Sequence, residues 1–419
     1  MISILAAVIL TVLATLVILN LRAEKKIDVE PTHIYAASDP QFLRSMGVLL
    51  GPPLAEGNRV ETLINGDRIF PSMLQAIASA RQTISFETYI YWSGDIGKRF
   101  AEALAERSRA GVKVNVLVDW LGSQKMDNDS IEVMRQAGVD FRKYRPLRWY
   151  NLGRVNNRTH RKLLVVDGRV GFTGGVGIAD NWSGDAQDPE HWRDNHYRIE
   201  GPAVAQMQAA FMDNWTKVSG VVLHGDQFFP PEKRAGAQYA QVFQSSSEGG
   251  SESMHLMYLL SIAAATKTID LAMAYFVPDK VTSEALIDAM KRGVRVRLIL
   301  PGENTDVEFV RSASRAGWGP LLKAGALIHE YQPTMYHVKL LIVDGLWSSV
   351  GSTNFDARSF RLNAEANLNV YDEEFARLQI GAFDADLRKA RRITYEEWES
   401  RPWHEKLKEH AAAIFSSQL

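Results

Sequence analysis

The sequence predicts an α/β protein built from two similar halves, each an α-β-α sandwich, related by a pseudo-twofold axis and preceded by one N-terminal transmembrane helix. Three observations support this prediction. The pattern His-x-Lys-x4-Asp occurs twice, starting at His160 and at His337. The segments before the two copies repeat one another, with helix-like and strand-like patterns in alternation. The chain also begins with an uncharged apolar run.

Each copy of the pattern contains a buried strand. Short apolar runs rich in β-branched residues lie at Leu163–Val166 and Leu340–Val343, and each ends at an Asp-Gly turn signal. Because side chains alternate along a strand, the His and the Lys of each copy point to the same face. Burying an imidazole beside an ammonium costs free energy unless that face opens into a site. The candidate catalytic side chains are therefore His160, Lys162, His337 and Lys339.

Asp167 and Asp344 complete the two patterns and fall at the ends of the strands. We include them among the candidate catalytic residues as members of the pattern. An Asp that precedes Gly is, however, typical of a turn, where its carboxylate accepts local hydrogen bonds. We therefore expect both residues to support the structure around them.

The duplication reaches beyond the two patterns. Residues 77–84 match 262–269, residues 109–114 match 291–296, and residues 136–139 match 323–326. Alternating helices and strands predict a mostly parallel or mixed sheet covered on both faces. We expect first-half strands at 60–64, 83–92 and 112–119, and helices at 70–80, 98–110 and 130–137, with Pro71 in the first turn of its helix. A Pro-, Gly- and charge-rich seam at 224–236 divides the chain into halves 58–230 and 231–419.

Charge and cysteine content exclude several classes of function. The chain has 48 Lys and Arg against 49 Asp and Glu, so it lacks the positive balance of a nucleic-acid-coating protein. It has no cysteine, which excludes disulfides, thiolate zinc sites and cysteine nucleophiles. His191 and His196 flank Asp194, but no cluster of further ligands surrounds them. We therefore expect no metal site and no cofactor.

The N-terminus is predicted to be an uncleaved membrane anchor, residues 1–22. Ile2–Leu21 is long enough to span a bilayer and carries no charge. A cleaved signal peptide is the alternative, but the sequence has neither the charged n-region nor the A-x-A-like cleavage site of such a peptide. Arg22, Lys25 and Lys26 follow the apolar run, which by the positive-inside rule places the rest of the chain in the cytoplasm. Residues 23–57 are expected to form a polar connector.

Two copies of one pattern suit the cleavage of a phosphodiester. In-line displacement needs a nucleophile on one side of phosphorus and an acid behind the leaving oxygen, with positive groups around the equatorial oxygens. Two halves related by a pseudo-twofold axis would supply two imidazoles and two lysines across one phosphate. A neutral imidazole can attack and an imidazolium can protonate, giving a covalent phosphohistidine. Attack on it by an alcohol gives transfer, and attack by water gives hydrolysis.

The paired patterns and their surroundings resemble the phospholipase D superfamily, and most of all its bacterial cardiolipin synthases with one membrane anchor. The likeness covers nearly all of the chain after about residue 55. The segments that carry it are 87–92, 159–175, 192–204, 274–278, 337–344, 351–359 and 363–367. The resemblance implies that His160 is the nucleophile and His337 the general acid. It also implies that phosphate is bound by Lys162, Lys339 and Asn354.

The resemblance further implies a supporting role for Asp194, Glu365 and Ser352. Asp194 and Glu365 occupy matching places in the two halves and would hydrogen-bond the imidazoles, which fixes their tautomers. The alternative is that they are two surface acids beside strands. One position departs from the family pattern: the second half has Asn354, whereas the first has Gly177 where Asn is usual. Either the phosphate contacts are asymmetric, or Asn181 or a backbone N–H substitutes.

Two stretches combine basic and aromatic residues in a way that suits a lipid headgroup interface. Arg142–Arg158 precedes the first pattern and contains Trp149 and Tyr150. Arg388–Trp403, in the basic and aromatic helical tail, is equally well explained as a solvated helix with partly buried tryptophans.

We therefore expect a phosphatidyltransferase of the bacterial inner membrane that converts two phosphatidylglycerols into cardiolipin. Its partners would be the phospholipid substrate and the membrane, without nucleic acid. A hydrolytic phospholipase D would use the same residues. A nuclease-like phosphodiesterase is disfavoured by the membrane segment and the balanced charge. A scaffold with a decayed site is disfavoured because both patterns are intact.

Overall fold

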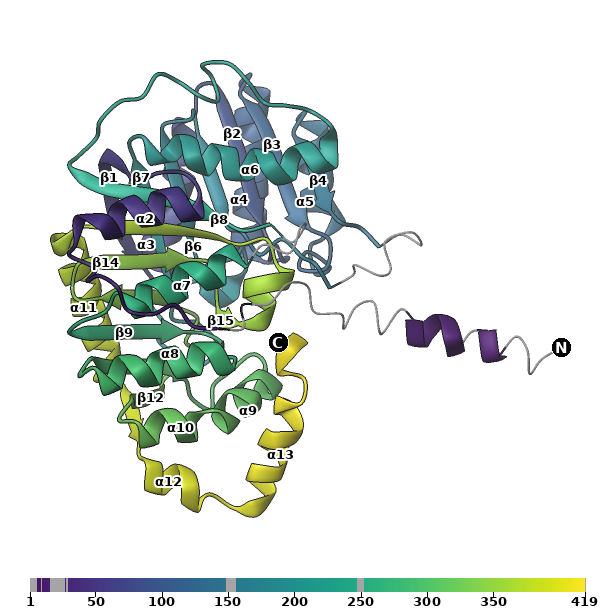
Figure 1. The fold of residues 1–419 in the computed structure, drawn as a ribbon. Coiled ribbons are helices and arrows are strands. Elements are labelled where there is room, and N and C mark those ends of the chain that lie inside the picture. The colour runs from purple at the N-terminus through teal and green to yellow at the C-terminus, as the bar shows by residue number, and fades with distance from the viewer. Residues whose placement is uncertain are drawn as a thin grey trace.

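The computed structural model describes residues 6–8, 10–15, 27, 29–147, 156–246 and 252–418. Their central feature is one mixed sheet that continues through both halves of the chain (Figure 1). Among the described residues the sheet has 15 strands, in the order β17-β12-β11-β9-β13-β14-β16-β8-β1-β7-β6-β5-β2-β3-β4. Reading outward from the antiparallel central pair β8–β1, the two sides follow the same topological order, and β17 is added at one edge. The predicted α/β duplication is confirmed.

The first-half strands lie in the following order along the chain. They are β1 (Ala55–Ile64), β2 (Thr83–Thr88), β3 (Lys113–Asp119), β4 (Asp140–Tyr144), β5 (Leu163–Val166), β6 (Val170–Gly174) and β7 (Asn195–Glu200). The pairs β2–β3 and β3–β4 are parallel, whereas β2–β5, β5–β6, β6–β7 and β1–β7 are antiparallel. The sheet is therefore mixed, as expected.

The second half repeats this arrangement. Its strands are β8 (Gln238–Gln244), β9 (Thr268–Met273), β11 (Arg295–Pro301), β12 (Leu327–Tyr331), β13 (Lys339–Val343), β14 (Trp347–Gly351), β16 (Ala366–Tyr371) and β17 (Ala390–Ile393). A separate parallel pair joins β10 (Phe276–Val277) to β15 (Phe355–Asp356).

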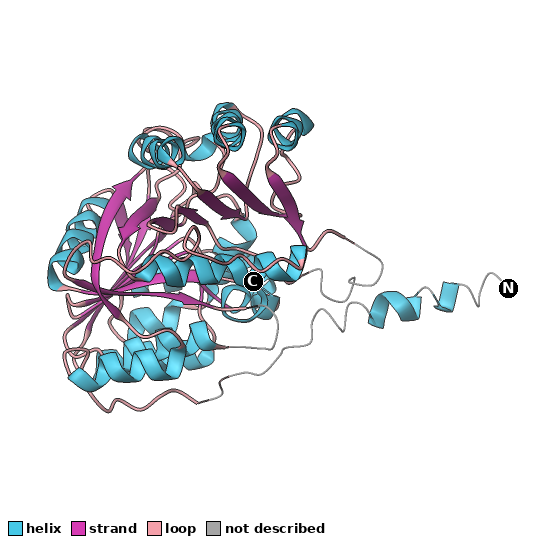
Figure 2. Cartoon of the chain, turned by 90° about the horizontal axis from the view of Figure 1, so that it is seen from above, coloured by secondary structure: helices cyan, strands magenta, loops and turns pink. Residues whose placement is uncertain are grey.

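Helices cover both faces of the sheet (Figure 2). The first half contributes α3 (Gly66–Ser79), α4 (Asp95–Arg109), α5 (Asn128–Gln136) and α6 (Ala203–Ser219). The second contributes α7 (Ser253–Ala263), α8 (Lys280–Lys291), α9 (Glu308–Ala316), α10 (Trp318–Lys323), α11 (Glu373–Leu387), α12 (Tyr395–Ser400) and α13 (Trp403–Ala413). Short helical turns occur at η2 (Asp180–Trp182), η3 (Arg358–Leu362) and η4 (Ser416–Gln418).

Alternating side chains of the two pattern strands divide the core into three parts. In β5, Leu164 and Val166 enter an outer core of the first half, while Leu163 and Val165 enter a central core. In β13, residues 341 and 343 enter an outer core of the second half, while residues 340 and 342 join the same central core. Because the central core draws on both halves, it fixes one half against the other.

The structure corrects the predicted boundaries in the first half. Residues 40–50 lie in the predicted connector but form α2 (Pro40–Leu50), which buries Phe42 edge-on against Trp347 with ring centroids 5.1 Å apart. Strand β1 begins at Ala55 and β2 ends at Thr88, four residues before the predicted end at Trp92. Pro71 lies inside α3 instead of in its first turn, because the helix already begins at Gly66. Apolar periodicity does not mark such ends, which depend on tertiary contacts.

The predicted membrane anchor falls mostly outside the described residues. Residues 6–8 and 10–15 are helical and exposed. Nowhere in the described part of the chain is there a helix with both the length and the apolar character needed to cross a bilayer.

Candidate functional site

The two His-x-Lys patterns meet where the halves of the chain touch. Just before β5, the His160 N–H donates to the Ala364 carbonyl of the other half at 2.8 Å, and Thr159 forms a parallel bridge with Ala364. Just before β13, the His337 N–H donates to the Arg193 carbonyl at 2.8 Å, and Arg193 forms a parallel bridge with Tyr336. The same backbone arrangement therefore occurs twice, related by the pseudo-twofold axis.

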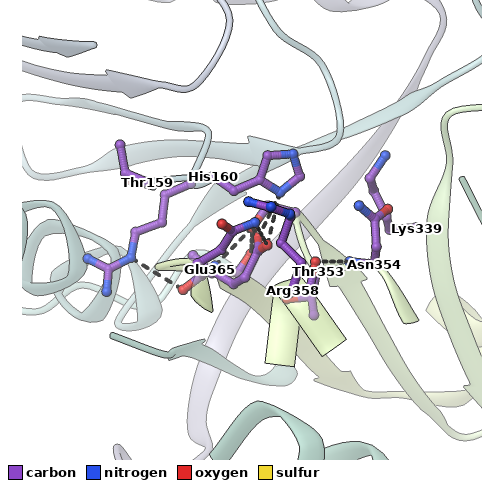
Figure 3. A network of polar contacts seen from close by, with 12 residues as sticks. Thr159, His160, Lys339, Thr353, Asn354, Arg358 and Glu365 are labelled. Atoms are coloured by element: carbon purple, nitrogen blue, oxygen red, sulfur yellow. Dashed lines mark hydrogen bonds and ion pairs between the residues drawn. The ribbon is translucent and has the colours of Figure 1, made fainter. Parts of the chain in front are cut away.

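Each bridge places a buried carboxylate of one half against the imidazole of the other, and Figure 3 shows the pair formed by His160 and Glu365. His160 Nδ1 lies 3.0 Å from both carboxylate oxygens of Glu365. His337 Nδ1 lies 2.7 Å from Asp194 Oδ2. An ionised carboxylate accepts a hydrogen bond, so the ring nitrogen that faces it, Nδ1, carries the hydrogen and Nε2 of the neutral ring carries none. The sequence placed the two acids in matching positions, but it did not indicate that the contacts cross between the halves.

The two carboxylates are themselves held by further hydrogen bonds, which differ between the halves. Ser352 Oγ donates to Glu365 Oε2 at 2.5 Å, and Asn363 Nδ2 donates to Glu365 Oε1 at 3.3 Å. Asp194 Oδ2 accepts instead from the Trp182 indole at 3.0 Å. Gly175, which matches Ser352, has no side chain, and a Cβ there would lie 2.4 Å from Asp194 Oδ1. The Trp182 indole thus gives Asp194 the side-chain hydrogen bond that the Ser352 hydroxyl gives Glu365.

Burial and the neighbouring charges set the protonation of these groups. Burial raises the pKa of both carboxyls, but the adjacent imidazoles and lysines outweigh it, so Asp194 and Glu365 have pKa values below the ordinary ones. Burial lowers the pKa of His160 to about 4, against the opposing effect of Glu365. Burial and Lys339 also lower the pKa of His337. Without substrate both imidazoles are therefore neutral near pH 7, the form in which Nε2 is a nucleophile or a base.

Lys162 and Lys339 lie at the same junction between the two halves. Lys162 Nζ donates to the His160 carbonyl at 2.8 Å, and Lys339 Nζ donates to the His337 carbonyl at 2.6 Å. Lys339 Nζ also lies 3.1 Å from His337 Nε2. Burial lowers the pKa of Lys162 well below its ordinary value and that of Lys339 to about 8. Positive charge on a buried lysine favours binding of an anion next to it.

Asn354 joins the site from the second half, beside Lys339 (Figure 3). Its backbone N–H is held by Ser359 Oγ at 3.2 Å, whereas its buried Oδ1 has no hydrogen-bond partner among the described residues. At the matching first-half position, a Cβ on Gly177 would lie 2.8 Å from Ile90 Cβ and 3.2 Å from Trp182 Cζ3. No asparagine fits there without displacing these side chains. Of the two readings left by the sequence, asymmetric contacts agree with this packing.

Asp167 and Asp344 do not join the histidines. Asp167 Oδ1 accepts from the backbone N–H groups of Gln82 and Thr83 at 2.7 and 2.9 Å, at the far end of β5. Asp344 Oδ1 accepts in the same way from Lys267 and Thr268 at 2.7 and 2.9 Å. Both aspartates have positive φ, 52° and 55°, as a type I′ turn requires. These contacts agree with the structural role expected for the two aspartates, and their listing among the catalytic residues stays a prediction.

Aromatic side chains surround the two imidazoles, and the sequence did not single them out as site residues. Tyr89 lies edge-on to His160 with centroids 5.3 Å apart. His337 packs against both Trp182 and Trp192, at centroid distances of 5.3 and 5.6 Å, and the two indoles are 4.6 Å from each other. Trp192 and Tyr89 belong to segments that resemble the family, but no local pattern marks Trp182. It reaches the site only through the turn η2.

The structure also locates the histidines considered as metal ligands and the stretches considered as lipid contacts. His191 Nδ1 contacts Asp188 Oδ1 at 2.6 Å, and the described residues contain no cluster of metal-ligating side chains. Trp149 and Tyr150 lie outside the described residues. In the tail, Trp398 packs against Gly319 and the Arg401 guanidinium, whereas Trp403 is exposed.

Comparison with known proteins gives consistent results. A family model described as "Cardiolipin synthase, PLD-like domain" matches residues 73–215 and 258–387. A cardiolipin synthase from Geobacillus kaustophilus is 35% identical over 372 residues, covering 88% of this chain and 74% of the relative. The major cardiolipin synthase ClsA of Bacillus subtilis is 34% identical over 368 residues, covering 87% and 76%.

A solved structure shares the fold. The crystal structure of a phosphatidylserine synthase from Haemophilus influenzae superposes with a TM-score of 0.67 at 13% identity, covering 86% of this chain and 95% of that one. At this identity the likeness concerns the arrangement of the strands and helices alone.

Proposed function

The chain belongs to the cardiolipin synthases with phospholipase-D-like domains, and from this membership we propose that it joins two phosphatidylglycerols into cardiolipin and releases glycerol. The observation that supports the proposal most is the pair of crossed contacts, His160–Glu365 and His337–Asp194. They provide two oriented imidazoles from opposite halves, which is the minimum that an in-line displacement with a covalent intermediate requires.

In the first step, His160 Nε2 attacks the phosphorus of the first phosphatidylglycerol. The P–N bond forms as the P–O bond to the glycerol headgroup breaks, and His337 supplies the proton to the departing glycerol oxygen. Because its pKa is lowered in the free site, His337 must gain this proton as the phosphodiester binds. The negative charge of the lipid favours that protonation. Glu365 stabilises the positive charge that develops on the His160 ring.

In the second step, a hydroxyl of another phosphatidylglycerol attacks the phosphatidyl-His160 intermediate. His337, now neutral, accepts the hydroxyl proton, the P–O bond of cardiolipin forms, and the P–N bond breaks. Two phosphatidylglycerols thus give one cardiolipin and one glycerol, and both histidines return to their starting states. The lysines Lys162 and Lys339, with Asn354, would bind the equatorial phosphate oxygens, where charge builds up during both displacements.

The proposal includes an N-terminal membrane anchor at residues 1–22 with the catalytic part on the cytoplasmic face. Its support is the uncharged apolar run followed by Arg22, Lys25 and Lys26. Cysteine labelling in intact cells tests the orientation, because the natural chain contains no cysteine. A cysteine introduced on the catalytic part should react with a membrane-impermeant reagent only after the cells are opened. If the introduced cysteine reacts in intact cells, the catalytic part lies on the outer face of the membrane and the proposed orientation is wrong.

Product analysis tests the proposed reaction. The full chain is incubated with vesicles of phosphatidylglycerol, and the lipids and glycerol are quantified. Cardiolipin and glycerol should appear in equal amounts, and none should form with His160→Ala. Phosphatidic acid as the sole lipid product would show that water is the acceptor and would overturn the transferase assignment.

A further inference from the structure

Helix α13 is attached to the protein by its polar side. Glu409 is almost completely buried and binds two guanidinium groups, Arg315 at 2.9 Å and Arg401 at 2.7 Å. Ala412, on the same side, joins a small buried cluster with Val310 and Ala313 of α9. A surface helix ordinarily turns its apolar stripe toward the core and its charges toward water. The orientation of α13 is the reverse.

The opposite side of α13 is an exposed apolar stripe. Trp403, Leu407 and Ile414 have exposed fractions of 75%, 62% and 77%. Their spacing of four and seven residues places them on one helical face, nearly opposite Glu409. Phe415 extends the stripe and contacts Phe309 of α9, which is itself exposed. Large apolar side chains grouped in this way mark an interaction surface.

Basic side chains flank the stripe on both sides. Lys408 lies on one flank and Lys406 on the other, accompanied by His404 and His410. Both lysines form ion pairs at the surface, Lys408 with Glu308 at 3.1 Å and Lys406 with Glu399 at 3.9 Å. Such pairs are weak and are readily replaced by other anions. An apolar stripe bordered by cations has the chemistry of a helix that lies in an anionic lipid interface.

The turn η4, which follows α13, contacts the segments that flank the candidate active site. Arg358 Nε donates to the Gln418 carbonyl at 3.1 Å, and Asn156 Nδ2 donates to Gln418 Oε1 at 2.8 Å. Asn156 lies four residues before His160, and Arg358 lies four residues after Asn354 (Figure 3). The turn that follows the exposed stripe is therefore hydrogen-bonded to the segment before His160 and to the segment after Asn354.

We propose that the exposed face of α13, made by Trp403, Leu407, Ile414 and Phe415, inserts into the surface of an anionic phospholipid bilayer and sets the active site against it. The proposal rests on the proposed function, because a lipid substrate must pass from the bilayer into the site. Trp403 and Phe415 suit the depth of the headgroups, and the flanking lysines suit phosphatidylglycerol.

A fluorescence experiment on the full chain tests the surface directly. A single cysteine introduced as Leu407→Cys is labelled with an environment-sensitive dye, and Lys98→Cys on the exposed side of α4 serves as the matched control. In phosphatidylglycerol vesicles, the dye at 407 should be quenched by nitroxide-bearing lipids and shielded from iodide. The dye at 98 should show the reverse. Equal access of iodide to both positions would overturn the proposal, as would shielding at 407 without lipid quenching, which would indicate a second protein copy.

An activity experiment separates membrane insertion from catalysis. The triple variant Trp403→Ser, Leu407→Ser, Ile414→Ser removes exposed side chains and should keep the melting temperature of the parent. Its cardiolipin formation should fall about tenfold or more on vesicles, but stay within about twofold on phosphatidylglycerol dispersed in detergent micelles. Equal losses in both, or none in either, would contradict the proposal. If the parent forms no cardiolipin at all, the proposed function fails, while the dye experiment still reports on the surface.

Discussion

The two halves of the molecule share one backbone plan but surround their histidines differently. His160 lies beside Tyr89, and the carboxylate that orients it is held by the Ser352 hydroxyl. His337 packs against Trp182 and Trp192, and the Trp182 indole also donates to the carboxylate that orients His337. Duplication thus supplies the pair of imidazoles, and the side chains around them make the pair unequal. These unlike surroundings are consistent with the different roles proposed for the two histidines.

Removing the imidazoles should produce the largest effects and should separate the two halves. His160→Ala should abolish cardiolipin formation, because no covalent intermediate can form. His337→Ala should lower the rate by about 10²–10⁴-fold, the usual contribution of a general acid or base. Radiolabelled phosphatidylglycerol with rapid acid-free quenching measures the protein-bound label. Label on the His160→Ala variant would reverse the assignment of nucleophile and acid.

The crossed carboxylates should come next. Glu365→Gln and Asp194→Asn keep the size of each side chain but disturb the tautomer, so each should lower kcat by about 10²-fold or more. Glu365→Gln should slow formation of the covalent intermediate, and Asp194→Asn should slow both proton transfers. Single-turnover kinetics distinguish the two. Matched controls are Ser352→Ala and Trp182→Phe, which remove one supporting hydrogen bond and should cost less than the carboxylate that each supports.

Substitutions at Asn354 and at the matching Gly177 test whether the two halves contribute differently to the proposed binding of phosphate. Asn354→Ala should lower kcat/KM by about tenfold or more, since it removes a donor from the site of developing charge. Gly177→Asn restores the symmetric pattern, yet it should lower the melting temperature and give no gain in rate, because its Cβ would collide with Ile90. Increased activity of Gly177→Asn at unchanged stability would show that the first half accepts a phosphate ligand.

The pH dependence should reflect Lys339, whose pKa is lowered by burial to about 8 from an ordinary 10.5. Activity should fall as the pH rises above about 8, since Lys339 loses the charge that we propose binds phosphate. Stability should change in the opposite direction. Between these two pKa values the unfolded chain binds more protons, so the free energy of unfolding rises with pH.

Urea denaturation and kcat/KM measured across this range check both trends. In Lys339→Met the part of this pH dependence of the free energy of unfolding that is due to Lys339 should disappear. In Lys339→Arg the fall in activity should move to higher pH, because the guanidinium stays charged. If the fall in activity at high pH is unchanged in Lys339→Arg, that fall is caused by another titrating group.

The smallest effects, and the only equal ones, should come from the turn aspartates. Asp167→Asn and Asp344→Asn each weaken charge-assisted hydrogen bonds to backbone N–H groups, so each should lower stability by about 1–3 kcal/mol. Because neither touches the histidines, kcat should stay within about twofold at a temperature where the variants are folded. A large and selective loss of kcat in one of them would place that carboxylate in the reaction after all.

Local pattern was enough to predict the elements that the site is built from. The strands at 163–166 and 340–343, the Asp-Gly turns and the repeated order of helices and strands all follow from periodicity and turn chemistry over a few residues. Family resemblance added the roles proposed for the histidines, lysines and Asn354. The contact between each imidazole and a carboxylate was also foreseen, without its crossing between the halves.

Tertiary structure alone decided which carboxylate serves which histidine, the indole support from Trp182, the packing that excludes a side chain at Gly177, and the outward stripe of α13. These features depend on residues that are far apart in the sequence, such as the 205 positions between His160 and Glu365. Secondary-structure propensity acts over a few residues, whereas such contacts form only once a shared core aligns the two halves.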